Sequence, residues 1–196
     1  MNLKQLPYRI TPVHLLRDGG QQHSEGYAAL NPQELVPTLR HDGQVLHQSM
    51  AILDYLDEVF PLPALLPDDA AGRARVRALA QLLACDIHPL NNLRVMQFFS
   101  DTWSVPQPER DDWTRHWMQV GFEAMERMLV ESVDTGRFCH GDSPGLADCC
   151  LVPQLYNARR FNVDMGPYPT LARIDAACLA LPAFDAARPE HQPDAA

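Results

Sequence analysis

Two short motifs, twelve residues apart, could together hold a small peptide by its backbone and its carboxylate. In the first, Pro37 follows Val36 at the start of a predicted strand, and only an X-Pro bond becomes cis at low cost. A cis turn would direct the backbone groups of Val36 outward, where an extended peptide can pair with them. In the second, Ser49 follows Gln48 as a plausible N-cap, and free amides at a helix start bind carboxylates. Alone, each motif favours a structural role, whereas together they describe half of a peptide site.

A histidine, an asparagine and two arginines form a second group that could hold a small anion. His88 and Asn92 are four residues apart and can share one helix face, although Pro89 distorts that spacing. Arg160 lies at the end of a predicted helix, where the helix dipole stabilises a cation. Hydrogen bonding to a freed carbonyl and helix capping are the structural alternatives. Because the chain is acidic, His88, Arg94 and Arg160 are candidates for a local positive site that attracts a small anionic substrate.

The composition of the chain excludes several classes of protein. Its 196 residues include 16 lysines and arginines against 25 aspartates and glutamates, which gives a net charge of −9. This balance argues against binding to nucleic acid or to an anionic membrane surface. The sequence has no apolar run near the roughly 18 residues that a spanning helix needs, and its N-terminus lacks a secretory pattern. We therefore expect a soluble, cytoplasmic protein.

The cysteines and histidines show no pattern of a disulfide framework or of a metal site. The five cysteines are an odd number without a C-x-x-C pair, and the adjacent Cys149 and Cys150 point about 100° apart on a helix. The histidines form no cluster with ligand spacing. We expect buried free thiols and no metal.

The first third of the chain has the pattern of a small α/β unit. The pair Asp42-Gly43 lies between two β-like stretches and favours a hairpin turn. The apolar residues after this hairpin lie on one broad face of a helix. The expected elements are strands over 8–13, 36–40 and 44–47 and a helix over about 49–60.

From about residue 68 the pattern becomes helical. Asp68 or Asp69 can cap a long helix, and Pro89 is expected to kink it just after His88. In a later helix, Asp148 can bond back to the cap amide three residues before it. The other expected helices lie over about 113–128, 146–157 and 170–181, and the polar tail over 188–196 is expected to be loose.

The order of these motifs resembles the glutathione transferase superfamily, and within it the zeta class, the maleylacetoacetate and maleylpyruvate isomerases. The resemblance covers nearly the whole chain. Its motifs are Arg17-Asp18-Gly19-Gly20-Gln21-Gln22-His23, Ala29-Leu30-Asn31-Pro32, Leu35-Val36-Pro37-Thr38-Leu39, Gln48-Ser49 and Asp86-Ile87-His88-Pro89-Leu90-Asn91-Asn92-Leu93.

The resemblance implies a fold, a cofactor and a reaction. The fold is an incomplete thioredoxin-like α/β part over 1–63 joined to an all-α domain over 68–196, assembled as a homodimer. Glutathione thiolate would add to the cis double bond of a small anionic diacid from aromatic catabolism, allow rotation and leave again, while the protein stabilises the enolate-like intermediate. The implied glutathione-binding positions are Gln22, Val36, Gln48 and Ser49, and the implied substrate-binding positions are His88, Asn92, Arg94 and Arg160.

One departure from the family is large. Its members open with a strand and a helix bearing a Ser-Ser-x-Ser-x-Arg-Val-Arg motif, whose serine activates the thiol, whereas this sequence starts at Met1. No serine here can be assigned that role, so the catalytic residue is unknown. Without the neighbouring strand, either residues 1 to about 14 are displaced or disordered, or the natural product begins upstream and includes the serine motif. Two alternatives stay open: a general glutathione transferase or peroxidase, and a non-catalytic protein that binds glutathione.

Overall fold

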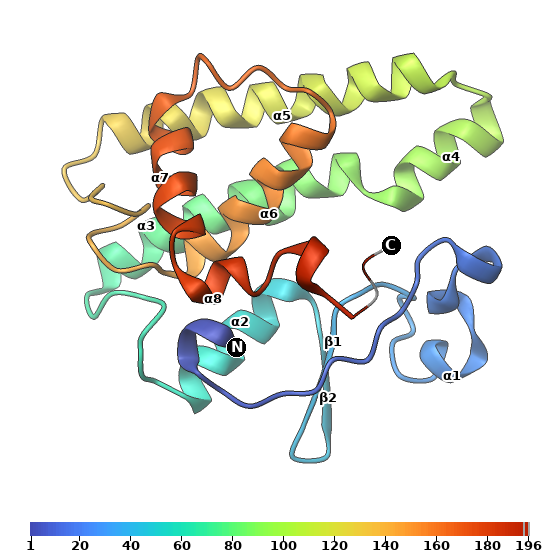
Figure 1. Cartoon of the computed structure of the whole chain (residues 1–196), viewed down its shortest axis with the longest axis horizontal. Helices are drawn as coiled ribbons and strands as arrows, with labels where there is room; N and C mark the ends of the chain where they lie inside the picture. Colours follow the sequence, from blue (N-terminus) through green and yellow to red (C-terminus); the bar gives the residue numbers. More distant parts are fainter. Residues whose placement is uncertain (194, 196) are drawn as a thin grey trace. The chain divides into compact units, whose positions relative to one another are not determined.

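A computed structural model describes residues 1–193 and 195, and the chain divides into two units (Figure 1). The first unit joins residues 1–63 to the C-terminal residues from Pro182 onward, and the second unit is Ala64–Leu181. The boundary drawn from the sequence, between 63 and 68, assigned the C-terminal residues to the helical domain instead. A small sheet with helices and a mainly helical remainder match the expected thioredoxin-like and all-α parts.

A two-stranded hairpin carries the first unit to its main helix. Strand β1 (Thr38–His41) pairs antiparallel with β2 (Gln44–His47). Asp42 and Gly43 have φ values of 47° and 77°, the left-handed backbone that a type I′ turn requires. The hairpin and the helix after it are therefore confirmed, the helix being α2 (Ser49–Val59).

The predicted strand over residues 8–13 does not form, and the segment is drawn as coil in Figure 1. Within the described residues, the sheet contains β1 and β2 alone, so this segment has no ladder partner. The backbone of residues 8–13 makes no hydrogen bond to any described residue, and Tyr8 and Ile10 are exposed over 46% and 41% of their surface. The β-type side chains favour a strand, but a strand is stable only beside another strand.

The start of the chain is instead fixed by one buried lysine. Lys4 lies at the end of a 3₁₀ turn over Asn2–Lys4, and only 1% of its side chain is exposed. Its ammonium donates to Asp57 Oδ1 at 2.7 Å, to the Phe60 carbonyl at 2.6 Å and to the Pro63 carbonyl at 2.8 Å. These bonds connect the N-terminal residues to the end of α2.

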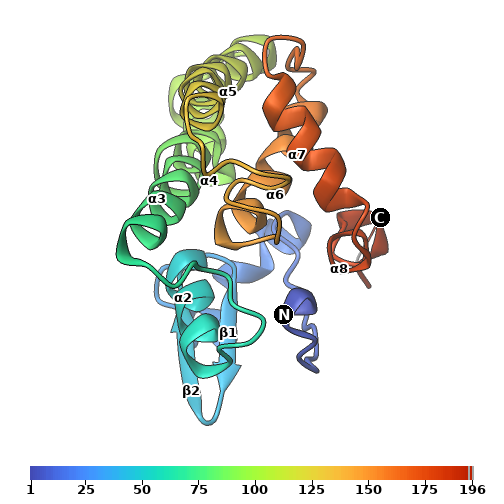
Figure 2. The same ribbon diagram turned by 90° about the vertical axis from the view of Figure 1, so that its left-hand side faces the viewer.

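The second unit is a bundle of helices around α6, which packs against both α3 and α7 (Figure 2). Its core includes Phe122, Leu151 and Leu155, which are almost completely buried. No helix within residues 1–193 combines the length and the apolar character that crossing a membrane requires. The bundle consists of α3 (Ala70–Gln81), α4 (Leu93–Trp103), α5 (Gln107–Val130), α6 (Leu146–Arg160) and α7 (Pro169–Leu179). The first unit, besides α2, holds two short helices, α1 (Glu25–Ala28) and α8 (Pro182–Asp185).

The long helix predicted after Asp69 is interrupted near the expected place. A π-helical stretch, Leu82–Ile87, follows α3, and a 3₁₀ turn, His88–Asn91, follows that. Pro89 lacks a backbone N–H and cannot continue the α-helical ladder. The sequence analysis did not predict α4, which begins after Asn92, where the Asn92 side chain accepts from the Arg94 amide.

The predicted cap of α6 is present. Asp148 Oδ2 accepts from the Gly145 amide at 2.8 Å, and Oδ1 accepts from the Cys139 amide at 3.0 Å. The side chain is buried, and burial raises the pKa of the Asp148 carboxyl because the charged form loses hydration.

The cysteines and the C-terminal tail differ in part from what the sequence predicts. Cys85 is exposed, so the prediction of buried thiols is wrong for that residue, although Cys139 and Cys178 are buried. It fails because helical spacing alone does not say which side of the π-helical stretch faces the core. The tail over 188–196 includes a 3₁₀ turn, Pro189–His191, and positions 194 and 196 lie outside the described residues.

Candidate functional site

The peptide half-site in the first unit begins at Val36. The bond between Val36 and Pro37 is cis, as the motif suggested, and Val36 is 44% exposed. Neither its N–H nor its C=O hydrogen-bonds to another described residue. An extended peptide can therefore pair with this residue through both groups.

Two side chains fix the turn that presents Val36. The carbonyl of Leu35 accepts from the Tyr27 hydroxyl at 2.7 Å and from Asn31 Nδ2 at 2.6 Å. Asn31 is almost fully buried, and its Oδ1 accepts from the Gln33 amide at 3.0 Å. The turn over residues 31–36 is thus held from both sides.

The start of α2 differs by one residue from the sequence prediction. Gln48, with φ 69° and ψ 120°, is the N-cap, and Ser49 is the first helical residue, so Ser49 does not cap the helix. The preference of serine for N-cap positions predicts a cap at Ser49, but the positive φ of Gln48 makes the helix begin one residue earlier. The Gln48 side chain does not cap either: its Nε2 donates to Gln33 Oε1 at 2.7 Å. The N-cap side chain therefore leaves the Ser49 amide at the start of α2 uncapped, and an amide at a helix start can bind a carboxylate.

Gln22 lies in a loop before α1 and is only 5% exposed. Its Nε2 lies 3.4 Å from the Leu15 carbonyl and 3.0 Å from His23 Nε2. His23 Nδ1 in turn contacts the Glu34 carboxylate. Within the described residues, Gln22 Oε1 is buried and has no hydrogen-bond partner. A buried amide oxygen without a protein partner suits a ligand or a water that donates a hydrogen.

Three of the four predicted anion-site residues lie on one short stretch of the second unit. Asn92 Nδ2 is 3.4 Å from His88 Nε2, and Asn92 Oδ1 accepts from the Arg94 amide at 3.2 Å. Surrounding atoms desolvate the imidazole and lower the pKa of His88 below its ordinary value. His88 is therefore neutral at pH 7 and can donate one hydrogen.

Arg160 is the last residue of α6 and makes no hydrogen bond or ion pair with those three. Both Arg94 and Arg160 are exposed. Neither guanidinium forms a side-chain hydrogen bond or ion pair with the part of the chain that the structure describes. Because a free guanidinium can bind a carboxylate with two parallel hydrogen bonds, each arginine is available to an anionic ligand.

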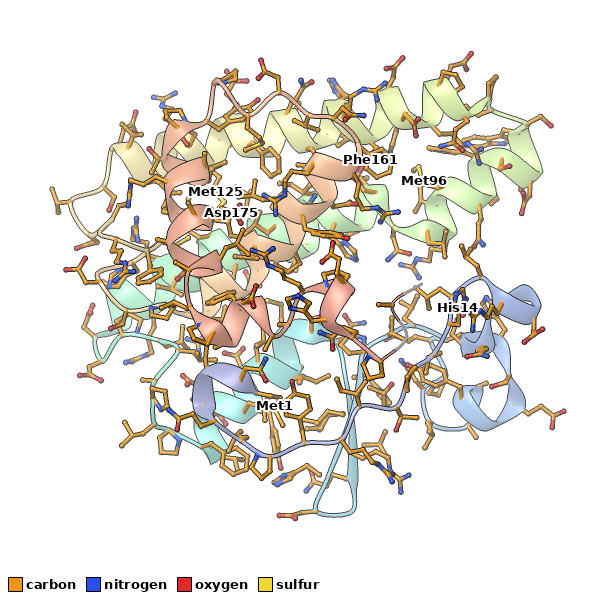
Figure 3. The ribbon with its side chains drawn as sticks, viewed as in Figure 1. Met1, His14, Met96, Met125, Phe161 and Asp175 are labelled. Carbon is orange, nitrogen blue, oxygen red and sulfur yellow. The ribbon has the colours of Figure 1, made fainter. Side chains whose placement is uncertain are left out.

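Helix α5 holds the stretch around His88 in place, which the sequence analysis missed. Trp113 Nε1 donates to the Leu90 carbonyl at 2.8 Å, and Arg110 Nη1 donates to the Met96 carbonyl at 3.2 Å. Met96 is labelled in Figure 3. Trp113 and Arg110 lie on the first turns of α5, and no local motif links them to their partners.

The same helix also holds the end of α6. Arg115 Nη1 lies 3.4 Å from the carbonyl of Phe161, the residue directly after Arg160. Arg115 is kept in position by an ion pair with Asp112 on its own helix. One rigid helix therefore supports both segments that carry the candidate anion-binding residues.

The chain is similar to several known proteins over nearly its whole length. The chain matches the family described as glutathione S-transferase, N-terminal domain, over residues 1–59. It is 48% identical to a probable maleylacetoacetate isomerase of Vibrio cholerae over 195 residues, which cover 100% of this chain and 90% of the relative. It is also 48% identical to a maleylpyruvate isomerase of Ralstonia sp over 197 residues, covering 100% of this chain and 92% of that protein.

A solved structure resembles the chain over its full length. The maleylacetoacetate isomerase of Methylobacterium extorquens AM1, solved with bound malonate and glutathione, superposes with a TM-score of 0.95 at 40% sequence identity. The match covers 100% of this chain and 91% of the other. That relative therefore holds both a glutathione and a small diacid.

Proposed function

Since the chain belongs to the zeta-class glutathione transferases, the maleylacetoacetate and maleylpyruvate isomerases, we propose that it is a glutathione-dependent cis–trans isomerase of one of these two substrates. The observation that carries the proposal is the 48% identity across the whole chain, which includes both the peptide half-site and the stretch around His88. The bound glutathione and malonate of the Methylobacterium relative support the cofactor and the class of substrate.

The residues of the first unit fit glutathione. We propose that the N–H and C=O of Val36, which have no partner among the described residues, pair with its peptide backbone, and that Ser49 at the start of α2 receives its carboxylate. Gln22 and Gln48 would accept its N–H groups. Bound glutathione supplies a thiolate that adds to the cis double bond and leaves after rotation about the resulting single bond.

The residues of the second unit fit the carboxylates of the substrate. Arg94 and Arg160 would bind the two ends of the diacid, because neither guanidinium has a side-chain partner among the described residues. His88, neutral through its lowered pKa, and Asn92 would donate hydrogens to the oxygen on which negative charge develops. Donors fixed before the reaction stabilise such charge without reorganising.

Membership of this family also supports a proposal for the location, the oligomeric state and the pathway of the enzyme. We propose a cytoplasmic homodimer that acts in aromatic catabolism, such as that of tyrosine or gentisate-type compounds. Its proposed partners are glutathione, a small anionic diacid and a second copy of the chain, and the net charge of −9 argues against nucleic acid or an anionic membrane.

A comparison of substrates tests this proposal. The purified chain is assayed with maleylacetone, maleylpyruvate and a chlorinated nitrobenzene at saturating glutathione. Isomerisation of one of the first two, at a rate well above conjugation of the aromatic, is expected. Faster conjugation indicates a general transferase, and glutathione binding without any turnover indicates a binding protein; either result contradicts the proposal.

A further inference from the structure

The orientation of the Gln22 carboxamide is fixed by its surroundings. A backbone carbonyl only accepts hydrogen bonds, so the Gln22 atom that lies 3.4 Å from the Leu15 oxygen must be its NH₂ group. The added Cβ of any residue larger than Gly20 would come within 2.5 Å of this NH₂ group. The same Cβ would lie 2.8 Å from Oε1, so Gly20 packs directly against the whole carboxamide. Within the described residues, Oε1 is then the end without a hydrogen-bond partner.

That orientation also fixes the tautomer of His23. The second hydrogen of the same NH₂ group points to His23 Nε2 at 3.0 Å, so Nε2 must be an acceptor. The ring proton then lies on Nδ1, where it is donated to the carboxylate of Glu34. A carboxylate on one ring nitrogen makes the other a better acceptor, and Glu34 thus acts on Gln22 through His23.

Gln33, the residue before Glu34, fixes the orientation of the second glutamine, Gln48. Gln33 Oε1 accepts from Gln48 Nε2 at 2.7 Å, so the Gln48 oxygen is the free end of that carboxamide. Asn31 holds this turn: its Oδ1 accepts from the Gln33 amide, and its backbone carbonyl accepts from the Glu34 amide at 2.9 Å. Gln33 therefore takes an amide hydrogen of Gln48 directly, whereas its neighbour Glu34 acts on Gln22 through His23.

We propose that Gln33 and the pair His23–Glu34 are positioning residues for glutathione, which orient Gln48 and Gln22 so that both present an oxygen to the ligand. This inference rests on the proposed function, since it names what holds the glutathione-binding glutamines. Glutathione carries an ammonium group and two peptide N–H groups, and a fixed oxygen acceptor matches such donors. The positioning residues themselves do not touch the thiol or the double bond.

The energetic effect is on binding and not on folding. His23 and Glu34 have half-exposed side chains, and one hydrogen bond between such side chains contributes little to the stability of a protein. A carboxamide that is free to turn, however, offers its NH₂ group to a ligand N–H for part of the time, so affinity falls. Preorganisation of the acceptor avoids this loss.

Calorimetric titration of the full chain with glutathione tests the proposal. Gln33→Met, which keeps the length and removes the acceptor, is expected to weaken glutathione binding about 3- to 10-fold, the value of one neutral hydrogen bond. Gln33→Glu retains an acceptor oxygen and is expected to bind within about twofold of wild type. His23→Phe is expected to match Gln33→Met, through Gln22 instead of Gln48.

The exposed Gln44 on β2 provides a matched control, because Gln44→Met makes the same change outside the network. With glutathione saturating, the KM for the diacid and kcat are expected to stay near wild type in Gln33→Met. Glutathione binding by Gln33→Met and His23→Phe as tight as wild type would overturn the inference, as would equal weakening by Gln33→Met and Gln33→Glu. Wild-type protein that does not bind glutathione would overturn the proposed function and this inference together.

Discussion

The ammonium of Lys4 lies 2.7 Å from the carboxylate of Asp57 on α2 and is almost completely buried. Two backbone carbonyls, those of Phe60 and Pro63, complete its set of acceptors. All three hydrogens of the ammonium are thus used, which is the condition under which a buried charge is tolerated. The relationship joins the first turn of the chain to residues more than fifty positions later.

Loss of this charge is expected to destabilise the first unit. Lys4→Met leaves the Phe60 and Pro63 carbonyls without this donor, and removal of one partner of a buried ion pair costs about 3–5 kcal/mol. Urea denaturation followed by circular dichroism measures the change. The exposed Arg9→Met, in the segment that lacks hydrogen bonds, is the control and is expected to change stability by less than about 0.5 kcal/mol. Equal stability of wild type and Lys4→Met would contradict the role of Lys4.

Hydrogen exchange is expected to distinguish residues 8–13 from the hairpin. Backbone amides in this segment have no hydrogen-bond acceptor among the described residues, whereas those of β1 and β2 are paired in a ladder. Exposed, unpaired amides exchange without an opening step. Mass spectrometry of exchanged peptides is expected to show fast exchange over 8–13 and slower exchange over 38–47. Strong protection of residues 8–13 would show that they pair as a strand after all.

The local elements of this fold could be predicted from the sequence because their signals lie within a few residues. The Asp42-Gly43 turn, the cap of α6 by Asp148 and the interruption at Pro89 all depend on neighbours in the chain. Helix α4 was missed, although Asn92 supplies a cap, because an aromatic-rich segment beside two prolines favours a loop as much as a helix.

The supports of the candidate site could not be predicted, because they join residues that are distant in sequence. Gln33 and Gln48 are 15 positions apart, and Trp113 reaches the Leu90 carbonyl across 23 positions. No periodicity or motif encodes such contacts. The positions that could bind ligand were suggested by motifs and by resemblance, whereas the residues that hold them required the fold.

The pH dependence of stability is expected to include a contribution from His88. Its pKa is lowered in the folded protein, so the unfolded chain binds a proton first as pH falls. The contribution of His88 is therefore fully present above the ordinary histidine pKa of about 6.5 and is lost as pH falls below it. His88→Gln is expected to lose less stability than wild type between about pH 6.5 and 5. Parallel curves for the two proteins in urea titrations across this range would contradict the shift.

The pH dependence of stability that Asp148 contributes at the cap of α6 is expected to have the opposite sign to that of His88. The pKa of Asp148 is raised, so its contribution to stability is present below the ordinary carboxyl pKa and is lost as pH rises through the folded value. The stability of wild type relative to Asp148→Asn is therefore expected to fall as pH rises from about 4 to 7. Thermal unfolding of both proteins across that range checks the sign. An increase in this relative stability would mean that the hydrogen bonds from the two backbone amides lower the pKa of Asp148 more than burial raises it.

The two free arginines of the second unit are expected to act on the diacid and not on glutathione. Arg160→Met removes a charge-assisted hydrogen bond worth about 1.5–3 kcal/mol, which corresponds to a loss in kcat/KM for the diacid of about tenfold or more. Glutathione affinity, measured by calorimetry, is expected to stay near wild type. Arg127→Met, another exposed arginine of this unit, is the control. Equal losses of glutathione binding and turnover would assign Arg160 a structural role.

The most direct test of the account is the glutathione dependence of isomerisation by the unaltered chain. Maleylacetone or maleylpyruvate is followed by absorbance as it converts to the trans isomer, with and without glutathione. The account predicts that conversion requires glutathione, saturates with it and ends at the trans product without net consumption of thiol. A folded protein that binds glutathione but leaves both cis substrates unchanged, or that isomerises them equally well without glutathione, would contradict it.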